Sequence, residues 1–302
     1  MKKYIHSTLT KLIKPFYWSG IGRIFPFNYI YKLYINIWDS INFSKNNTTI
    51  IKTTKYWFQM ILEKGKTIDE WIINLWVWEP HISELIKKNL QTWNVFLDLG
   101  TNIWYISLLA STIVGKEGKV LSFEPSELNF QRLNQNISLN QITNITPYKY
   151  GVWSKNSSET LFYNVSNPWG SSIVDIGWER QVFQEKIQII KLDDFLKEEK
   201  IDFIKMDIEW YEYFAIEWMI WILKNNKDIK MIFEYSPYYY KWIYGKDYEK
   251  KSIELLDMLV WVGFDLYEVS YKWNLLSIEN NSDFFHKINT SWAGQVDIFC
   301  KK

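Results

Sequence analysis

The sequence predicts an α/β fold in which helices cover both faces of a mainly parallel sheet. From residue 94 onward, short apolar segments alternate with segments whose apolar residues recur at helical spacing, as in successive βαβ units. The first apolar segment ends at Leu99 and runs into a turn that contains Gly100, which a helix follows. Hydrophobic residues make up 47% of the 302 residues, so the chain can form a sizeable core.

The expected strands are short and apolar, and they cover residues 94–99, 119–124, 145–152, 201–209, 229–236, 264–269 and 296–300. The expected helices show the 3.6-residue period, and they cover residues 79–90, 104–112, 126–140, 192–199, 211–225 and 248–262. Residues 49–62 are expected to be extended, residues 154–164 to form a hairpin, and residues 167–173 to form a loop. The aromatic stretch 236–245 is expected to be a loop that acts as an acceptor lid.

Residues 1–44 are expected to hold two helices, one before Pro15 and one after Pro26. We interpret residues 1–55 as a helical N-terminal extension and residues 56–302 as the main domain. Packing of the extension on the main domain is the plainest reading, with membrane contact or dimerisation as alternatives.

Composition excludes several classes of function. The net charge of +1 gives no electrostatic reason to expect a nucleic-acid partner or an anionic membrane surface. The single cysteine, Cys300, and the dispersed histidines His6, His81 and His286 give no disulfide framework and no metal site. Because no signal peptide or transmembrane segment is apparent, we expect a cytoplasmic protein.

The expected ligand site lies beyond the carboxyl ends of the strands, where ligands bind in open α/β sheets. Gly100 allows a tight turn, and the helix after it offers free N–H groups. Glu124 ends the second strand, where an acidic residue accepts hydrogen bonds from both hydroxyls of a ribose. This spacing indicates an adenosine ligand but does not separate nicotinamide cofactors from S-adenosylmethionine, and an incidental acid in an ordinary sheet is the alternative.

A second group of charged residues follows the strand at 201–209. Alternation places Lys205, Asp207 and Glu209 on one side of that strand. Carboxylates at this edge can deprotonate a hydroxyl, hold a substrate or bind a divalent ion. The alternative for Glu209 is that it only caps the next helix.

Four stretches together resemble the FkbM family of S-adenosylmethionine-dependent methyltransferases. They are FLDLGTNIWYISLLA, SFEPSELNFQRLNQNISLN, LDDFLKEEKIDFIKMDIEWYE and IFEYSP, and the likeness runs from about residue 55 to about residue 240. The family shows a D-x-G-A-N-x-G turn, an E-P motif that leads into a helix, and a K-x-D-x-E-G-x-E motif. The resemblance implies a Rossmann-like class I methyltransferase sheet of seven strands with the last antiparallel.

The resemblance also implies roles for individual residues. S-adenosylmethionine would be the cofactor, with Gly100 and Asn102 beside its methionine portion and Glu124 on its ribose, while Asp207 and Glu209 would face the acceptor. The full expected cofactor-binding set is Asp98, Gly100, Thr101, Asn102, Trp104, Glu124, Pro125 and Ser126. The expected catalytic set is Asp207 as general base, Glu209 as second choice and Lys205 as orienting group, with no metal.

Tryptophan replaces the family's glycine repeatedly. Trp104 and Trp210 stand at the motif glycines, and Trp93, Trp169 and Trp218 fall where glycine is usual. The chain holds 18 tryptophans and 12 glycines. One hypothesis is that the source reads the codon UGA as glycine, so that these residues are glycine in the natural protein. The alternative is a tryptophan-rich protein whose aromatic residues fill the core.

The leading functional hypothesis is methyl transfer to a small-molecule or sugar or glycoconjugate hydroxyl. The alternative is a non-catalytic binding or scaffold protein on the same fold, in which Trp104 and Trp210 obstruct the site. A nicotinamide-dependent dehydrogenase is disfavoured because Gly100-Thr101-Asn102 lacks the second glycine that a pyrophosphate needs.

Overall fold

The structure is a computed structural model that describes residues 48–153, 156–164, 167–172, 183–270, 274–291 and 293–302. The two helices expected in residues 1–44 lie outside the described residues.

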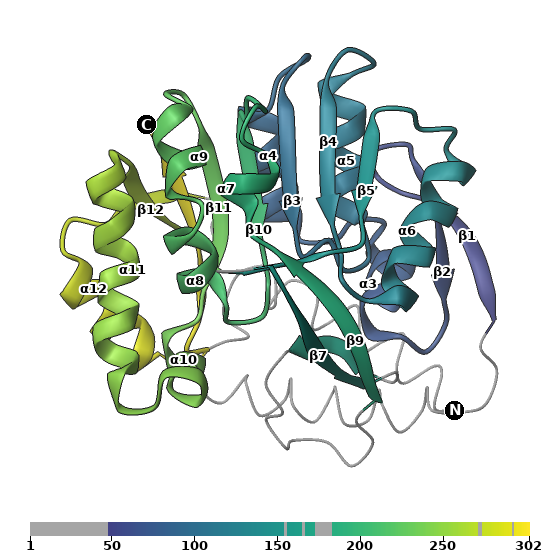
Figure 1. Cartoon of the computed structure of the whole chain (residues 1–302). Coiled ribbons are helices and arrows are strands. Elements are labelled where there is room, and N and C mark those ends of the chain that lie inside the picture. The colour runs from purple at the N-terminus through teal and green to yellow at the C-terminus, as the bar shows by residue number, and fades with distance from the viewer. Residues whose placement is uncertain (1–47, 154–155, 165–166, 173–182, 271–273, 292) are drawn as a thin grey trace.

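An eight-stranded sheet forms the centre of the molecule (Figure 1). From one edge to the other its strands are β5 (Ile145–Tyr148), β4 (Lys119–Phe123), β3 (Val95–Leu99), β10 (Phe203–Met206), β11 (Lys230–Tyr235), β14 (Val296–Lys301), β12 (Asp265–Val269) and β13 (Leu275–Ser277). The five strands from β5 to β11 are mutually parallel, and β14 is antiparallel to β11. The fold class predicted from the sequence is therefore confirmed.

The strand count is one higher than expected. The additional strand, β13, pairs antiparallel with β12 at the sheet edge. Its three residues are all exposed, so the sequence shows none of the apolar alternation that marks a half-buried strand. The sequence pattern therefore could not predict β13.

Helices cover both faces of the sheet, and successive strand residues point to opposite faces. Phe96, Val120 and Phe203 pack in one core with α3 (Thr67–Leu75), α4 (Pro80–Asn89) and α5 (Tyr105–Val114). Leu97, Leu121 and Ile204 pack in the other core. Its helices are α7 (Leu192–Phe195), α8 (Glu212–Glu217), α9 (Ile220–Asn225), α10 (Pro237–Tyr244), α11 (Tyr248–Val262) and α12 (Asn281–Asn289).

Two expected elements differ in the structure. The helix expected over residues 211–225 is divided into α8 and α9, because the carboxylate of Asp193 accepts hydrogen bonds from the backbone N–H groups of Trp221 and Ile222 and so caps a new helix. The stretch 236–245, expected to be a loop, forms helix α10 with Pro237 in its first turn.

A smaller sheet lies beyond the carboxyl ends of β3 and β4 (Figure 1). Its strands are β6 (Gly151–Val152), β9 (Phe183–Ile190), β7 (Ser157–Asn164) and β8 (Asn167–Ser172), in that spatial order. The expected hairpin at 154–164 is thus one strand of this sheet, and the expected loop at 167–173 contains another. The strand expected at 145–152 is shared between the two sheets.

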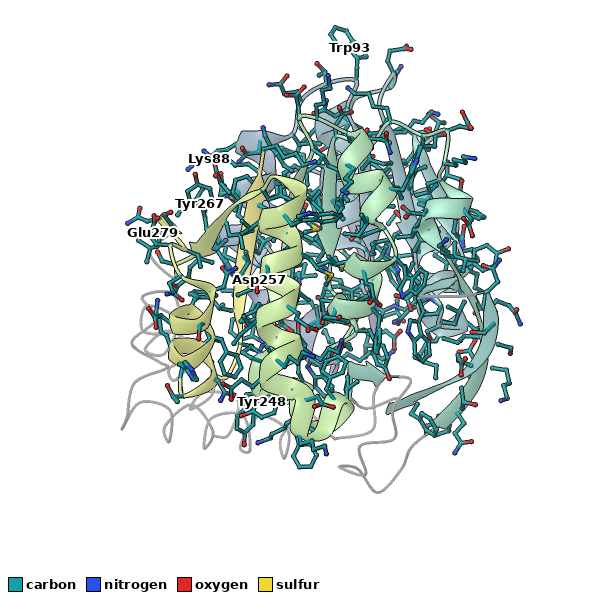
Figure 2. The ribbon with its side chains drawn as sticks, turned by 60° about the vertical axis from the view of Figure 1, so that its left-hand side comes forward. Lys88, Trp93, Tyr248, Asp257, Tyr267 and Glu279 are labelled. Atoms are coloured by element: carbon teal, nitrogen blue, oxygen red, sulfur yellow. The ribbon has the colours of Figure 1, made fainter. Side chains whose placement is uncertain are left out.

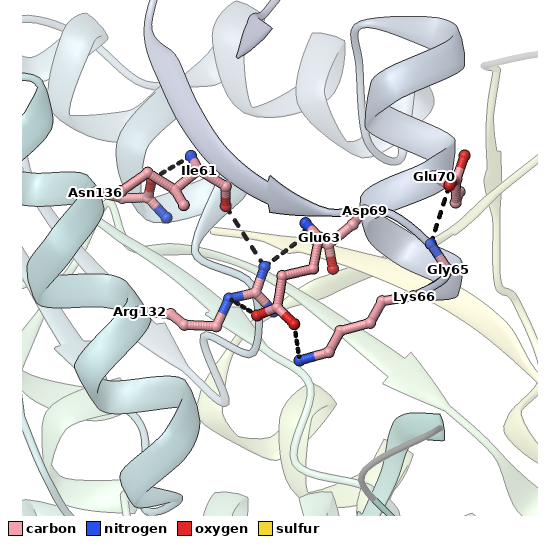
Figure 3. Close-up of polar contacts among 8 residues, drawn as sticks. All are labelled: Ile61, Glu63, Gly65, Lys66, Asp69, Glu70, Arg132 and Asn136. Carbon is pink, nitrogen blue, oxygen red and sulfur yellow. Dashed lines mark hydrogen bonds and ion pairs between the residues drawn. The ribbon is translucent and has the colours of Figure 1, made fainter. Parts of the chain in front are cut away.

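A two-stranded hairpin leads into the main domain. β1 (Thr49–Thr53) pairs with β2 (Gln59–Glu63), so residues on both sides of position 55 belong to one hairpin. Arg132 of α6 (Glu127–Leu139) forms ion pairs with Glu63 and Asp69, as Figure 3 shows. Because Arg132 and Asp69 are buried, the pair fixes the hairpin and α3 on α6.

Candidate functional site

The site lies where the chain leaves neighbouring strands β3 and β10 toward opposite sides of the sheet. Ligands bind at such a switch point in open α/β sheets. The backbone N–H of Asp207 donates to the carbonyl of Leu99 at 3.0 Å, which brings the loop after β10 against the turn after β3. Gly100 has a φ of 75° and no room for a Cβ, so this approach requires glycine.

Glu124 is anchored at the end of β4. Its Oε2 accepts from the backbone N–H of Asn102 at 2.9 Å, and its Oε1 accepts from the N–H of Ser126 at 3.0 Å. Burial raises the pKa of Glu124 to about 7, although these hydrogen bonds act in the opposite direction. The carboxyl group thus joins the two predicted cofactor-binding turns.

A pocket opens beside this carboxyl, and we call it the Glu124 pocket. It is lined by the turn after β3, the end of β4, the loop after β10 and the small sheet. Four members of the expected cofactor-binding set line it: Gly100, Asn102, Glu124 and Pro125. Asp207 lines the same pocket as Glu124, so the two acids predicted to grip the cofactor and to face the acceptor share one hollow.

The other members of that set lie elsewhere. Asp98 is fully buried behind the turn, where it accepts a hydrogen bond from the hydroxyl of Ser107. Burial raises the pKa of Asp98, while the nearby Lys205 lowers it. Ser126 is buried and contacts Glu124 through its backbone, and Thr101 lines a different pocket, described below.

Trp104 is also fully buried and lines neither described pocket. Its ring lies 5.4 Å from the guanidinium carbon of Arg132. The indole therefore points into the protein beneath the turn and does not fill the space beside Gly100. Its φ of 64° is left-handed.

Lys205 and Asp207 form an ion pair at 3.2 Å, in which Lys205 is buried and Asp207 is partly exposed. Burial lowers the pKa of Lys205, but the carboxyl groups of Asp207, Asp98 and Glu79 outweigh burial and raise it. Lys205 is 7% exposed and is held as a cation. The expected orienting group thus contacts the expected base.

Glu212, which the sequence did not mark as a site residue, fixes the loop that carries Asp207 and Glu209. Its Oε1 accepts from the backbone N–H groups of Ile208 at 3.2 Å and Trp210 at 3.3 Å. Its Oε2 accepts from the hydroxyl of Tyr240 at 3.3 Å. Burial raises the pKa of Glu212 to about 7. The available signal was its place as the last acid of the K-x-D-x-E-G-x-E motif.

A second pocket of about 390 Å³ lies on the other side of that loop, and we call it the Glu79 pocket. Its five carboxyl groups come from four separate segments of the chain: Glu79, Asp207 with Glu209, Glu234 and Asp297. Its basic residues are Lys205, which pairs with Asp207, and His81, whose Nε2 lies 3.1 Å from Oδ2 of Asp297. Only a folded chain brings these groups together, so the sequence did not predict Glu79, Glu234 or Asp297.

Proton affinities in the Glu79 pocket are raised. Burial, together with Asp297 and Asp207, raises the pKa of Glu79 to about 7 against the effect of Lys205. Burial and Asp207 raise the pKa values of Glu209 and Glu234 well above their ordinary range. Within the described residues, no group of three or more His, Cys, Asp or Glu is arranged to hold a metal ion.

Backbone strain marks the same region. Glu79, Asn102 and Glu209 have φ values of 39°, 46° and 53°. Non-glycine residues rarely adopt such angles, and where they do the strain concentrates at functional sites. All three line the Glu79 pocket, and Asn102, Glu209 and Asp207 line both pockets.

Solved structures similar to this chain include methyltransferases of low sequence identity. A precorrin-6y C5,15-methyltransferase from Geobacter metallireducens is 10% identical, with 75% of this chain and 91% of that chain covered and a TM-score of 0.41. An S-adenosylmethionine-dependent O-methyltransferase from Thermotoga maritima is 11% identical, with 87% and 96% covered and a TM-score of 0.42. The O-methyltransferase TomG from Streptomyces achromogenes is 9% identical, with 74% and 80% covered and a TM-score of 0.42.

Among curated protein sequences, none matches this chain. No helix in the described part of the chain has the length and apolar character that crossing a membrane requires.

The family model of the FkbM methyltransferase domain matches residues 98–262, which is more than half of the chain. The match begins at Asp98 and includes Glu124, the loop of Asp207 and Glu209, and the anchoring Glu212. The chain belongs to the FkbM family of methyltransferases.

Proposed function

We propose that the protein transfers a methyl group from S-adenosylmethionine to a hydroxyl oxygen. The Glu124 pocket binds the cofactor and the Glu79 pocket binds the acceptor. One observation carries this assignment: Asn102, Asp207 and Glu209 line both pockets, so a donor in one and an acceptor in the other meet at that boundary. The family resemblance of the motifs supports the same assignment.

The cofactor's ribose is the part that Glu124 recognises. Its carboxylate has lone pairs beyond those used by the N–H groups of Asn102 and Ser126, and these can accept from two ribose hydroxyls. The methionine portion lies along Gly100 and Asn102. The pocket has a volume of about 90 Å³ between the main sheet and the small sheet.

The chemical step needs alignment and removal of one proton. The sulfonium group is already activated, so the protein places the acceptor oxygen, the methyl carbon and the leaving sulfur in line. The acceptor hydroxyl gives its proton to Asp207 as the oxygen–carbon bond forms and the carbon–sulfur bond breaks. Lys205 orients Asp207 through their ion pair. Glu209 is the second candidate for the base, and Glu79 joins it because it lies in the same pocket with a pKa near neutrality.

The lining of the Glu79 pocket favours a hydroxylated small molecule or carbohydrate as the acceptor. Carboxyl groups accept hydrogen bonds from sugar hydroxyls, and the rings of Trp78 and Tyr239 offer apolar surface. A nucleic acid would bring phosphates toward the five carboxyl groups of this pocket, which electrostatics disfavours.

Methyl transfer from labelled S-adenosylmethionine tests the proposal. The protein is incubated separately with carbohydrate, small-molecule, nucleic-acid and protein fractions of its source cells, and the label is located by mass spectrometry. Label on an oxygen of a carbohydrate or small molecule is expected. Label on nucleic acid or protein contradicts the acceptor class, and label on carbon or nitrogen contradicts O-methylation.

A further inference from the structure

Tryptophan recurs at one kind of backbone position. Of nine non-glycine residues with positive φ in the described part, five are tryptophans. They are Trp57 (72°), Trp76 (65°), Trp93 (68°), Trp104 (64°) and Trp210 (77°). In this region the Cβ of an L-residue approaches a carbonyl oxygen, so a bulky residue there is a conformational outlier, whereas glycine adopts it freely.

The local roles of these positions are those that glycine fills. Trp76 ends α3 in the left-handed conformation, and its N–H donates to the carbonyl of Ile72 at 2.8 Å, as in glycine-terminated helices. The N–H of Trp57 donates to Thr54 at 3.1 Å and closes the turn between β1 and β2. Trp93 lies in the turn before β3.

At three of the five positions the indole ring brings little burial to offset this strain. Trp57, Trp76 and Trp93 are 87%, 55% and 70% exposed, and Figure 2 shows Trp93 projecting from the end of the molecule. Trp104 is buried, but its ring N–H has no hydrogen-bond partner. Leaving a buried donor unpaired is itself unfavourable.

We propose that glycine occupies positions 57, 76, 93, 104 and 210 of the natural polypeptide because its source translates UGA as glycine. A single reassigned codon explains why one residue type recurs at left-handed positions that differ in burial and in neighbours. Trp57 and Trp76 show the pattern although no motif marks them. Trp218 has a φ of −103°, so its backbone gives no reason to require glycine.

Glycine at position 210 would also change the proposed acceptor site, a conclusion that rests on the proposed function. The ring of Trp210 stacks on Tyr239 with centroids 5.1 Å apart and planes 4° apart, and both rings line the Glu79 pocket. Glycine at 210 removes the indole from the wall beside Glu209 and opens that face of Tyr239 to the pocket. Position 210 thereby sets the size of the acceptor, and the tyrosine ring provides a platform for a sugar ring.

Peptide sequencing by mass spectrometry of the protein isolated from its source tests the identity of these residues. Glycine at 57, 76, 93, 104 and 210 is the expected result. Tryptophan at these positions overturns the proposal.

Paired variants test the backbone argument. At 57, 76 and 93, the glycine variants should melt about 2–4 °C above the alanine variants, because alanine retains the left-handed strain. Trp261 is the matched control, since it is 66% exposed within helix α11. There the alanine variant should melt higher, because glycine weakens helices. Alanine equal to or better than glycine at all three test positions contradicts the proposal.

Trp210→Gly tests the step at the acceptor site. Transfer to the carbohydrate fraction should rise at least tenfold, while Trp93→Gly should leave it unchanged. Calorimetry with S-adenosylhomocysteine distinguishes failure of the proposed function from failure of the proposed role of position 210. Absence of binding in every variant refutes the proposed function, whereas binding with unchanged transfer in Trp210→Gly refutes only the role of position 210.

Discussion

The carbonyl oxygen of Asp207 lies 1.8 Å from the point that a Cβ on Gly100 would occupy. The turn after β3 and the loop after β10 are therefore in backbone contact. The first borders the Glu124 pocket, and the second separates that pocket from the Glu79 pocket. A change at Gly100 is transmitted directly to the carboxylates of the proposed acceptor site.

Gly100→Ala should reduce stability and displace the Asp207 loop. Steric overlap adds to the left-handed strain, for a combined loss of roughly 2–5 kcal/mol. Gly263→Ala is the control, since Gly263 also has a positive φ but has nothing within 4 Å of the added Cβ. It should lose only about 1–2 kcal/mol. Urea denaturation measures both losses, and equal losses would contradict the contact.

Stability should depend on pH through Glu124 and Glu212. Both have a pKa of about 7 in the folded chain, compared with 4.5 when unperturbed. Between these values the unfolded chain has released the protons and the folded chain retains them, so raising the pH favours unfolding. This contribution should be fully present below about pH 4.5 and should be lost by about pH 7, with a loss on the order of 3 kcal/mol per group.

Urea denaturation from pH 4.5 to pH 8 measures this dependence. Glu212→Gln removes one titrating group and keeps an oxygen for the N–H groups of Ile208 and Trp210. The slope of the unfolding free energy against pH in this window measures how many more protons the folded chain binds, and this number should be smaller by about one in that variant. An unchanged slope would show that Glu212 does not hold its proton in the folded chain.

Glu212 should act as a positioning residue for the loop. Glu212→Ala removes the acceptor that orders Ile208 and Trp210, so methyl transfer should fall about 100-fold. Glu212→Gln should recover most of that activity. Equal activity of the alanine and glutamine variants, with both folded by circular dichroism, would count against positioning.

Asp207→Asn tests the proposed general base. Methyl transfer should fall by 100-fold or more while S-adenosylhomocysteine binding persists, because the cofactor's ribose contacts a different acid. Glu79→Gln is the matched control, since it removes another carboxyl of the same pocket. Its activity should stay within tenfold of the original. A larger loss of methyl transfer in Glu79→Gln than in Asp207→Asn would indicate that Glu79 is the base.

The sequence predicted the parallel sheet because β3, β4 and β10 are buried apolar strands joined by helices with clear periodicity. It also predicted two residues of the cofactor pocket, since Gly100 directly follows β3 and Glu124 directly follows β4. Residues that follow neighbouring strands meet in space once the strand order is known. The structure supplies that strand order, in which β3 lies between β4 and β10.

Glu79, Glu234 and Asp297 could not be predicted in the same way. They come from the start of α4, β11 and β14, and the antiparallel pairing of β14 with β11 places Asp297 opposite Glu234. The role of Glu212 was hidden because its partners are backbone N–H groups of a strained loop. Sequence patterns report the burial of side chains, and they carry little information about such backbone contacts.

Calorimetric titration of S-adenosylhomocysteine into the protein, into Glu124→Ala and into Asp207→Asn tests the central claim most directly. The account predicts one binding site per chain. Removing the carboxylate that accepts two ribose hydroxyls should weaken binding at least about 100-fold, while Asp207→Asn should change it little. Binding that is unaffected in folded Glu124→Ala would contradict the claim that the Glu124 pocket holds the methyl donor.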